Sequence, residues 1–160
     1  MVILLMGVTG SGKTTVGKVL AAELGWKFAD ADDFHSPQNV AKMHAGIALS
    51  DEDREPWLVS LGKAIQNWTA EKCNVVLACS ALKEIYRARL LVSSEVKVVY
   101  LRGEYEEIRR RLAQRREHYM NPELLRSQFD ALEEPRNAVT VDITPSPEEI
   151  SSNIRHALGI

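Results

Sequence analysis

Apolar residues occur along the chain in two alternating patterns. Short, nearly continuous apolar runs are typical of buried strands in a parallel sheet. These runs predict strands at Val2–Met6, Lys27–Ala31, Asn74–Cys79, Lys97–Leu101 and Thr140–Ile143. Longer segments with apolar residues three and four positions apart predict helices. We expect these at Lys13–Leu24, Gln38–His44, Pro56–Glu71, Leu82–Leu91, Tyr105–Arg116, Pro122–Leu132 and Pro147–Leu158.

The alternation of strands and helices predicts one α/β domain over residues 1–160, with a parallel sheet covered by helices on both faces. Asp53 is a candidate N-cap for the helix predicted at Pro56–Glu71, and Pro56 suits a first helical turn. The sequence contains no internal repeat, low-complexity segment or long linker that would divide the chain.

The composition changes this picture little. Of the 160 residues, 45% are hydrophobic and 26% charged, and the formal net charge of -2 argues against a nucleic-acid-binding protein. Cys73 and Cys79 are too few for a disulfide scaffold and have no metal-ligand spacing. The apolar N-terminus lacks a basic segment and soon meets glycines, which excludes a signal peptide or a transmembrane helix. We therefore expect a cytoplasmic protein that binds neither nucleic acid nor membranes.

The most specific signal is the segment Gly7–Thr14, which matches G-x-x-x-x-G-K-[ST] in full. It follows a predicted strand and opens a predicted helix, as a P-loop does. In a P-loop, backbone N–H groups and the helix N-terminus bind phosphate oxygens, the lysine reaches the β- and γ-phosphates, and the final hydroxyl can bind Mg²⁺. We predict that a nucleoside triphosphate is bound by Gly7, Val8, Thr9, Gly10, Ser11, Gly12, Lys13, Thr14 and Thr15.

Acidic residues indicate how the nucleotide is used. Switch GTPases and mechanical ATPases usually carry an aspartate after a later buried strand, but the strand predicted at Asn74–Cys79 is followed by Ser80. Asp30 and Asp32 follow the second strand instead. Because residues two apart in a strand face the same way, we expect both at the carboxyl end of the sheet, where ligands of open α/β folds bind. This pair suits a substrate hydroxyl and the water shell of a metal.

Cationic residues suggest that the second substrate is an anion. His35, Lys42, Arg54, Lys83 and Arg87 follow the acidic motif at intervals. The densest basic run is 109–116, where Arg111 and Arg115 would share a helix face and repel each other. Bound phosphates would relieve that repulsion.

Together these motifs resemble the gluconokinase family of small P-loop kinases that act on sugar acids. The resemblance covers nearly the whole chain, and its most specific part is Cys79-Ser80-Ala81-Leu82-Lys83 followed by Tyr86-Arg87. Three positions depart from the family pattern. Ala31 replaces a usual glycine, Ser36 separates His35 from Pro37, and Tyr119 stands where phenylalanine is common. The charged positions are intact.

The resemblance implies a three-layer P-loop kinase with a five-stranded parallel sheet of the nucleoside-monophosphate-kinase-like type. It also implies a homodimer, a substrate flap at about 35–54 and a mobile lid at about 109–120. The implied reaction converts ATP and D-gluconate to ADP and 6-phospho-D-gluconate with Mg²⁺.

Residue roles follow from the same resemblance. The catalytic residues would be Lys13, Asp32 and Arg115, with Arg111 on the nucleotide. Thr14 would bind the metal directly and Asp30 through water. The substrate would be bound by Asp32, His35, Lys42, Arg54, Ser80, Lys83, Arg87 and His118.

Three other functions stay open from the residues alone: a different small-metabolite kinase such as a shikimate kinase, a regulatory P-loop protein, and a nucleic-acid kinase. The segment Cys79–Lys83 favours gluconate, because shikimate kinases usually have a glycine-rich turn there. The missing acid after Cys79 argues against a switch, and the net charge argues against a nucleic-acid substrate.

Overall fold

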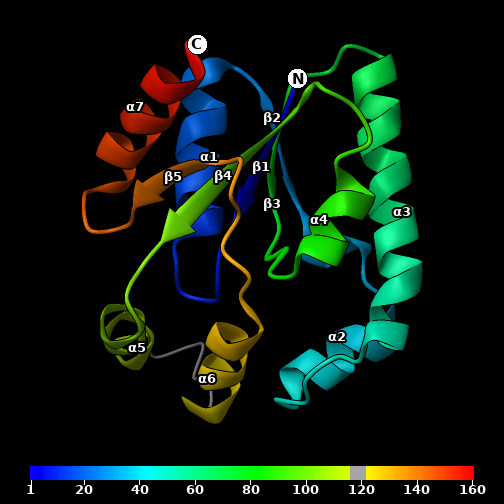
Figure 1. The fold of residues 1–160 in the computed structure, drawn as a ribbon, viewed down its shortest axis with the longest axis vertical. Coiled ribbons are helices and arrows are strands. Elements are labelled where there is room, and N and C mark those ends of the chain that lie inside the picture. Colours follow the sequence, from blue (N-terminus) through cyan, green and yellow to red (C-terminus); the bar gives the residue numbers. More distant parts are fainter. Residues whose placement is uncertain (116–121) are drawn as a thin grey trace.

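The computed structural model describes residues 1–115 and 122–160 and confirms the α/β fold (Figure 1). Within these residues, five parallel strands form one sheet in the order β2-β3-β1-β4-β5. The strands are β1 (Val2–Met6), β2 (Lys27–Asp30), β3 (Val75–Ala78), β4 (Val96–Arg102) and β5 (Val139–Asp142).

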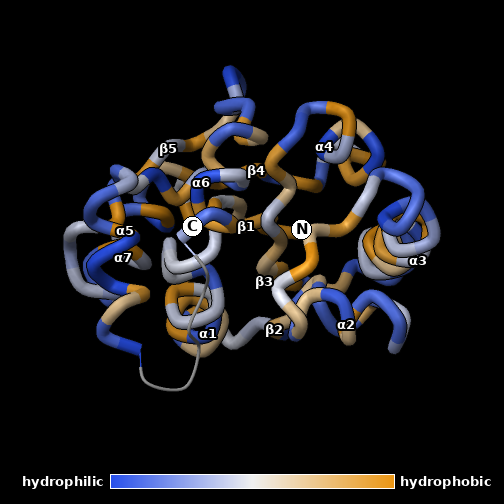
Figure 2. Tube along the Cα trace, turned by 90° about the horizontal axis from the view of Figure 1, so that it is seen from below, coloured by the Kyte–Doolittle hydropathy of each residue, from blue (hydrophilic) through white to orange (hydrophobic). Residues whose placement is uncertain are grey.

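The central strand β1 is buried along its whole length because helices cover both faces of the sheet. Val2, Leu4 and Met6 belong to the core beneath α3 (Asp51–Ala70) and α4 (Glu84–Leu90). Ile3 and Leu5 belong to the opposite core, which is covered chiefly by α1 (Lys13–Leu24) and α7 (Pro147–Leu158). Figure 2 accordingly shows hydrophobic stretches gathered at the central strands and hydrophilic ones mostly on the helices around them.

Several short elements lie beyond the carboxyl ends of the strands. The 3₁₀ helix η1 (Ala31–Phe34), α2 (Pro37–His44) and the start of α3 lie on one side. On the other side are α5 (Tyr105–Ala113) and α6 (Pro122–Ala131), as Figure 1 shows. The P-loop between β1 and α1 lies at the same end of the sheet. This is the end at which parallel α/β folds bind ligands.

The start of α3 differs from the prediction: the helix begins at Asp51 rather than at Pro56. Ser50 is the N-cap, because its hydroxyl accepts from the Asp53 amide at 3.1 Å while Asp53 Oδ2 accepts from the Ser50 amide at 3.0 Å. This reciprocal pair is a capping box. The prediction of Asp53 as N-cap is therefore wrong, and Pro56 lies inside the helix.

The strand β2 is also shorter than predicted. It ends at Asp30, because Asp30 Oδ1 accepts from the Asp32 amide at 3.0 Å and turns the chain into η1. Asp32 therefore does not reach its position by strand alternation. No helix in the described residues is long and apolar enough to span a membrane.

Candidate active site

The glycines of the P-loop are required by both backbone conformation and close packing. Gly7 has φ +153°, and a Cβ there would lie 2.9 Å from the carbonyl oxygen of Leu101. Gly10 has φ +82°, and a Cβ there would lie 3.0 Å from side-chain atoms of Ile108 and Leu112 in α5. Few residues other than glycine adopt these angles. The loop is thus held against β4 and α5 with no space for larger residues.

The side chains of the P-loop are arranged around the first turn of α1. Thr14 and Thr15 are exposed there, whereas Ser11 is fully buried. Ser11 Oγ has no hydrogen-bond partner among the described residues. Lys13 Nζ donates to the carbonyl oxygens of Gly7 and Val8, both at 2.9 Å. The lysine side chain therefore lies along the loop that is predicted to bind the phosphates.

Burial lowers the pKa of Lys13 to about 8. Neighbouring groups, including the carboxylates of Asp32 and Asp30, raise it again only in part. The positive charge of Arg115 also lowers the pKa of Lys13. Arg115 is therefore close enough to the P-loop to interact with it electrostatically. A lysine with such a pKa binds phosphate best below about pH 8, where it is charged.

Asp30 and Asp32, the two acids predicted for the site, lie beside the P-loop. Thr14 Oγ1 donates to Asp30 Oδ2 at 3.3 Å, and the other oxygen of Asp30 accepts from the Asp32 amide. Desolvation, together with the charge of Asp30, raises the pKa of Asp32, and Lys13 partly offsets this. Asp32 is therefore a stronger base than an isolated aspartate.

The residues present fit a magnesium ion that arrives with a nucleotide. Mg²⁺ is usually held by one or two protein oxygens together with phosphates and water. Thr14 and Asp30 offer a hydroxyl and a carboxylate side by side. Among the described residues there is no cluster of three or more acidic, histidine or cysteine side chains that could hold a metal.

Arg54 and Lys83, two of the predicted substrate residues, come together around Tyr86. Arg54 Nη1 donates to the Tyr86 hydroxyl at 3.2 Å, and its guanidinium carbon lies 5.3 Å from the ring centroid. Lys83 Nζ lies 5.7 Å from the same centroid. The Tyr86 hydroxyl in turn donates to Asp51. The two cations thus face one polar cluster between α3 and α4.

His35 follows η1, at the start of the predicted flap. Its ring stacks on Trp57 with 4.5 Å between centroids, and the Trp57 indole donates to the carbonyl oxygen of Ala31 at 2.7 Å. Burial, followed by the charge of Arg54, lowers the pKa of His35. A neutral imidazole at pH 7 can both donate and accept a hydrogen bond. His35 and Trp57 also line a cavity of about 510 Å³ between α2 and α3.

Lys42 pairs with an acid between α2 and α3. Its ammonium group lies 3.0 Å from both carboxylate oxygens of Asp53 and so joins α2 to α3. Asn39 supports the same junction by donating to the Asp53 carbonyl oxygen at 2.7 Å. These contacts give Lys42 a role in holding the predicted flap segment together.

The chain matches known proteins over nearly its full length. A mouse (Mus musculus) protein named probable gluconokinase is 46% identical over 98% of this chain and 97% of its own length. The crystal structure of a gluconokinase from Sinorhizobium meliloti 1021 superposes with a TM-score of 0.88 at 38% identity, covering 98% of this chain and 90% of that one. The chain belongs to the gluconokinase family.

Two further matches agree with this fold. An unliganded sugar kinase from Janibacter sp. HTCC2649 has a TM-score of 0.91 and 40% identity, covering 99% of this chain and 94% of its own. The family model described as shikimate kinase matches residues 9–157. The sequence pattern of shikimate kinases thus also fits this chain. The matches of 46% and 38% identity to gluconokinases decide which of the two families it belongs to.

The segment shared with the gluconokinase family after β3 is held by a buried arginine. Arg87 Nη1 donates to the carbonyl oxygens of Ala81 and Leu82 at 2.8 and 3.0 Å. The Ser80 carbonyl oxygen in turn accepts from the Gly7 amide at 3.3 Å. Arg87 was predicted to bind substrate, but these contacts use it to support the turn beside the P-loop.

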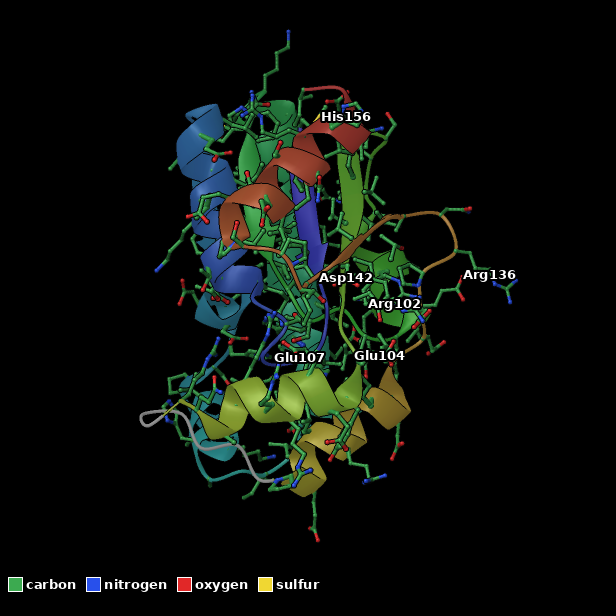
Figure 3. The ribbon with its side chains drawn as sticks, turned by 90° about the vertical axis from the view of Figure 1, so that its left-hand side faces the viewer. Arg102, Glu104, Glu107, Arg136, Asp142 and His156 are labelled. Atoms are coloured by element: carbon green, nitrogen blue, oxygen red, sulfur yellow. The ribbon has the colours of Figure 1, made fainter. Side chains whose placement is uncertain are left out.

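Arg111, which was predicted to contact the nucleotide, makes two contacts within the protein. Its Nε donates to Glu107 at 3.0 Å and its Nη2 donates to the carbonyl oxygen of Ile143 at 2.6 Å, which joins α5 to the segment after β5. Figure 3 shows Glu107 near Glu104, Arg102 and Asp142, residues that line a second cavity of about 150 Å³.

The helix predicted at Tyr105–Arg116 ends, as α5, at Ala113. Arg115 therefore lies beyond the helix, and the argument that it shares a helical face with Arg111 is wrong. Arg115 is exposed. His118 and the remainder of the predicted lid after Arg115 lie outside the described residues.

One contact of the P-loop was missed by sequence reasoning. The Thr9 amide donates to Gln128 Oε1 at 2.7 Å, and Gln128 Nε2 lies 3.1 Å from Thr9 Oγ1. Gln128 belongs to α6, and no local pattern relates it to a loop 119 positions earlier. Only the family resemblance, which includes Ser127-Gln128-Phe129, could have drawn attention to it.

Proposed function

We propose that the protein transfers the γ-phosphate of ATP to D-gluconate and releases ADP and 6-phospho-D-gluconate. The observation that carries this proposal is that Asp30 and Asp32 lie beside a complete P-loop. The sequence supports it, because the chain is 46% identical to a protein named probable gluconokinase. Phosphoryl transfer requires positioning and charge neutralisation more than covalent chemistry. The residues fall into a donor side and an acceptor side.

On the donor side, the loop amides and Lys13 bind the β- and γ-phosphates. Thr14 and, through water, Asp30 would hold Mg²⁺, which would supply positive charge against those phosphates. The 3.3 Å hydrogen bond between Thr14 and Asp30 supports this assignment. Arg115 stabilises charge on the transferring group, because its charge already reaches Lys13. The prediction that Arg111 contacts the nucleotide requires it to leave the Ile143 carbonyl.

On the acceptor side, Asp32 orients the primary hydroxyl of the sugar acid and accepts its proton. Its raised pKa supports a role as base. Arg54 and Lys83 bind the carboxylate, since an arginine can donate two parallel hydrogen bonds to it. His35 donates to hydroxyl groups, and Ser80 and His118 stay predicted substrate-binding residues. Lys42 and Arg87 act mainly through the segments that they hold.

The oligomeric state and the cellular location stay predictions. The family resemblance implies a homodimer, and the sequence suggests a cytoplasmic location. Sedimentation of the purified protein would test the first, and cell fractionation the second.

The proposal is tested by coupled measurement of ADP release across a panel of sugar acids, polyols, shikimate and nucleosides. We expect gluconate to give the highest kcat/KM and turnover without an acceptor to be negligible. ADP release at the same rate with and without gluconate would instead indicate a nucleotide hydrolase. A preference for shikimate would contradict the assignment of the acceptor.

A further inference from the structure

One hydrogen-bond donor and two cations converge on a single carboxylate oxygen of Asp51. The Tyr86 hydroxyl donates to Asp51 Oδ1, and Lys83 Nζ and Arg54 Nη1 each lie 3.8 Å from the same oxygen. The hydrogen bond from Tyr86, followed by the charge of Lys83, holds the pKa of Asp51 below its usual range. The carboxylate is therefore ionised at neutral pH. Two cations and a phenol converging on one carboxylate form a carboxylate receptor.

This receptor lies beside the proposed reaction site. Arg54 is close enough to His35 for its charge to lower the pKa of that ring. Lys83 follows the turn whose Ser80 carbonyl binds the P-loop. The receptor thus borders the acceptor side, with Arg54 from α3 and the other two donors from the start of α4.

Asp51 is exposed, and its side chain is not needed to cap α3. It is the first residue of α3, but Ser50 and Asp53 cap that helix without it. Its side chain is 72% exposed, compared with 29% for Arg54 and 36% for Lys83. Exposed ion pairs at such distances contribute little, and a carboxylate bound bidentately by Arg54 would be held more firmly. The two cations are thus less exposed than the carboxylate that they face.

We propose that Asp51 is an internal competitor for the carboxylate of the sugar acid, which displaces it from Arg54, Lys83 and Tyr86. This inference rests on the proposed gluconate phosphorylation. Competition by Asp51 would favour sugar acids over neutral polyols, because a polyol has no carboxylate that could replace that of Asp51. The receptor then stays paired with Asp51. The apparent affinity for a sugar acid is reduced by the fraction of receptors that Asp51 occupies.

The test compares Asp51→Asn with Glu52→Gln in steady-state kinetics. Both substitutions remove one charge from the first turn of α3, but Glu52 lies on the side that lines the cavity between α2 and α3. We expect Asp51→Asn to lower the KM for gluconate about two- to fivefold, the range that an exposed ion pair allows. The KM for ATP, the kcat and the KM for glucitol should not fall. Glu52→Gln should behave as the wild type.

Two results would overturn the inference while leaving the proposed function in place. An unchanged KM for gluconate in Asp51→Asn would show that Asp51 does not compete. A raised KM would show that Asp51 positions Arg54 for the substrate. Asparagine at position 51 would still offer an amide oxygen to the Tyr86 hydroxyl, and alanine would not. Asp51→Ala should therefore lower the KM for gluconate at least as much as Asp51→Asn. If the wild type itself fails to phosphorylate gluconate, the proposed function is wrong and the inference falls with it.

Discussion

Thr14 of the P-loop and Asp30 at the end of β2 are joined by a hydrogen bond of 3.3 Å from Thr14 Oγ1 to Asp30 Oδ2. The two residues belong to separate motifs, yet the parallel order β2-β3-β1 brings both to the same end of the sheet. A hydroxyl and a carboxylate in contact can hold one metal ion together, the hydroxyl directly and the carboxylate through a metal-bound water. This pair links the nucleotide side of the site to the acidic turn before the flap.

The first prediction concerns magnesium. Asp30→Asn should raise the Mg²⁺ concentration needed for half-maximal activity by about 10- to 100-fold, as is typical when an outer ligand of a metal is lost. Asp33→Asn is the matched control, because Asp33 is an exposed carboxylate in the same turn. Activity is measured against Mg²⁺ at fixed ATP. If both variants follow the wild-type curve, Asp30 does not hold the metal.

The second prediction is that Asp32→Asn reduces kcat by about 10²- to 10⁴-fold, the usual contribution of a general base. ATP binding should change far less, because we propose that Asp32 contacts the acceptor and not the nucleotide. Steady-state kinetics and ATP binding by calorimetry measure the two effects. A loss of kcat below about threefold would assign the acceptor side to another carboxylate.

The same substitution should not destabilise the fold. Folding raises the pKa of Asp32, so the ionised carboxylate costs stability, and this cost develops as pH rises through the raised pKa. At neutral pH, Asp32→Asn removes the charge and with it the cost. We expect a Tm equal to or above that of the wild type at pH 7, with the gain disappearing at acidic pH. A lower Tm at pH 7 would show that the charge is stabilising.

The third prediction concerns Lys13, whose pKa is about 8. Bound phosphates favour the charged lysine, so ATP binding should be accompanied by proton uptake above about pH 8 and should weaken as pH rises further. Calorimetry in buffers of different ionisation enthalpy measures this uptake. Lys13→Ala should abolish both the uptake and phosphoryl transfer, whereas Lys18→Ala, an exposed lysine of α1, should retain both. Proton uptake that persists in Lys13→Ala would assign it to another group.

The fourth prediction concerns the contact between α6 and the P-loop. Gln128→Ala removes both hydrogen bonds to Thr9, and we expect the KM for ATP to rise by about two- to tenfold for each bond that orders the loop. Ser127→Ala is the control, because its hydroxyl donates within α6, to the Leu124 carbonyl oxygen. An unchanged KM for ATP in Gln128→Ala would show that the loop is ordered without this contact.

Local motifs could be predicted from the sequence, whereas the direction of long side chains could not. The P-loop was recognisable because its geometry depends on residues adjacent in the chain. Asp32 was placed correctly for the wrong reason: a turn, not strand alternation, brings it to Asp30. Arg87 and Arg111 were assigned to ligands, yet they donate to the backbone carbonyls of Ala81 and Ile143. The Arg111 partner lies 32 positions away, and the Arg87 partner, six positions away, depends on how the chain turns after β3. Residue spacing reveals neither.

Phosphoryl transfer to gluconate is measured by following the γ-phosphate of labelled ATP in the presence of D-gluconate. We expect the label to be recovered on the primary hydroxyl of gluconate, in equal amount with ADP, and Asp32→Asn to transfer it far more slowly. Glucitol should react with a kcat/KM at least about tenfold lower, because hydrogen bonds to a charged group are lost. Label recovered as inorganic phosphate, with gluconate unchanged, would contradict the account.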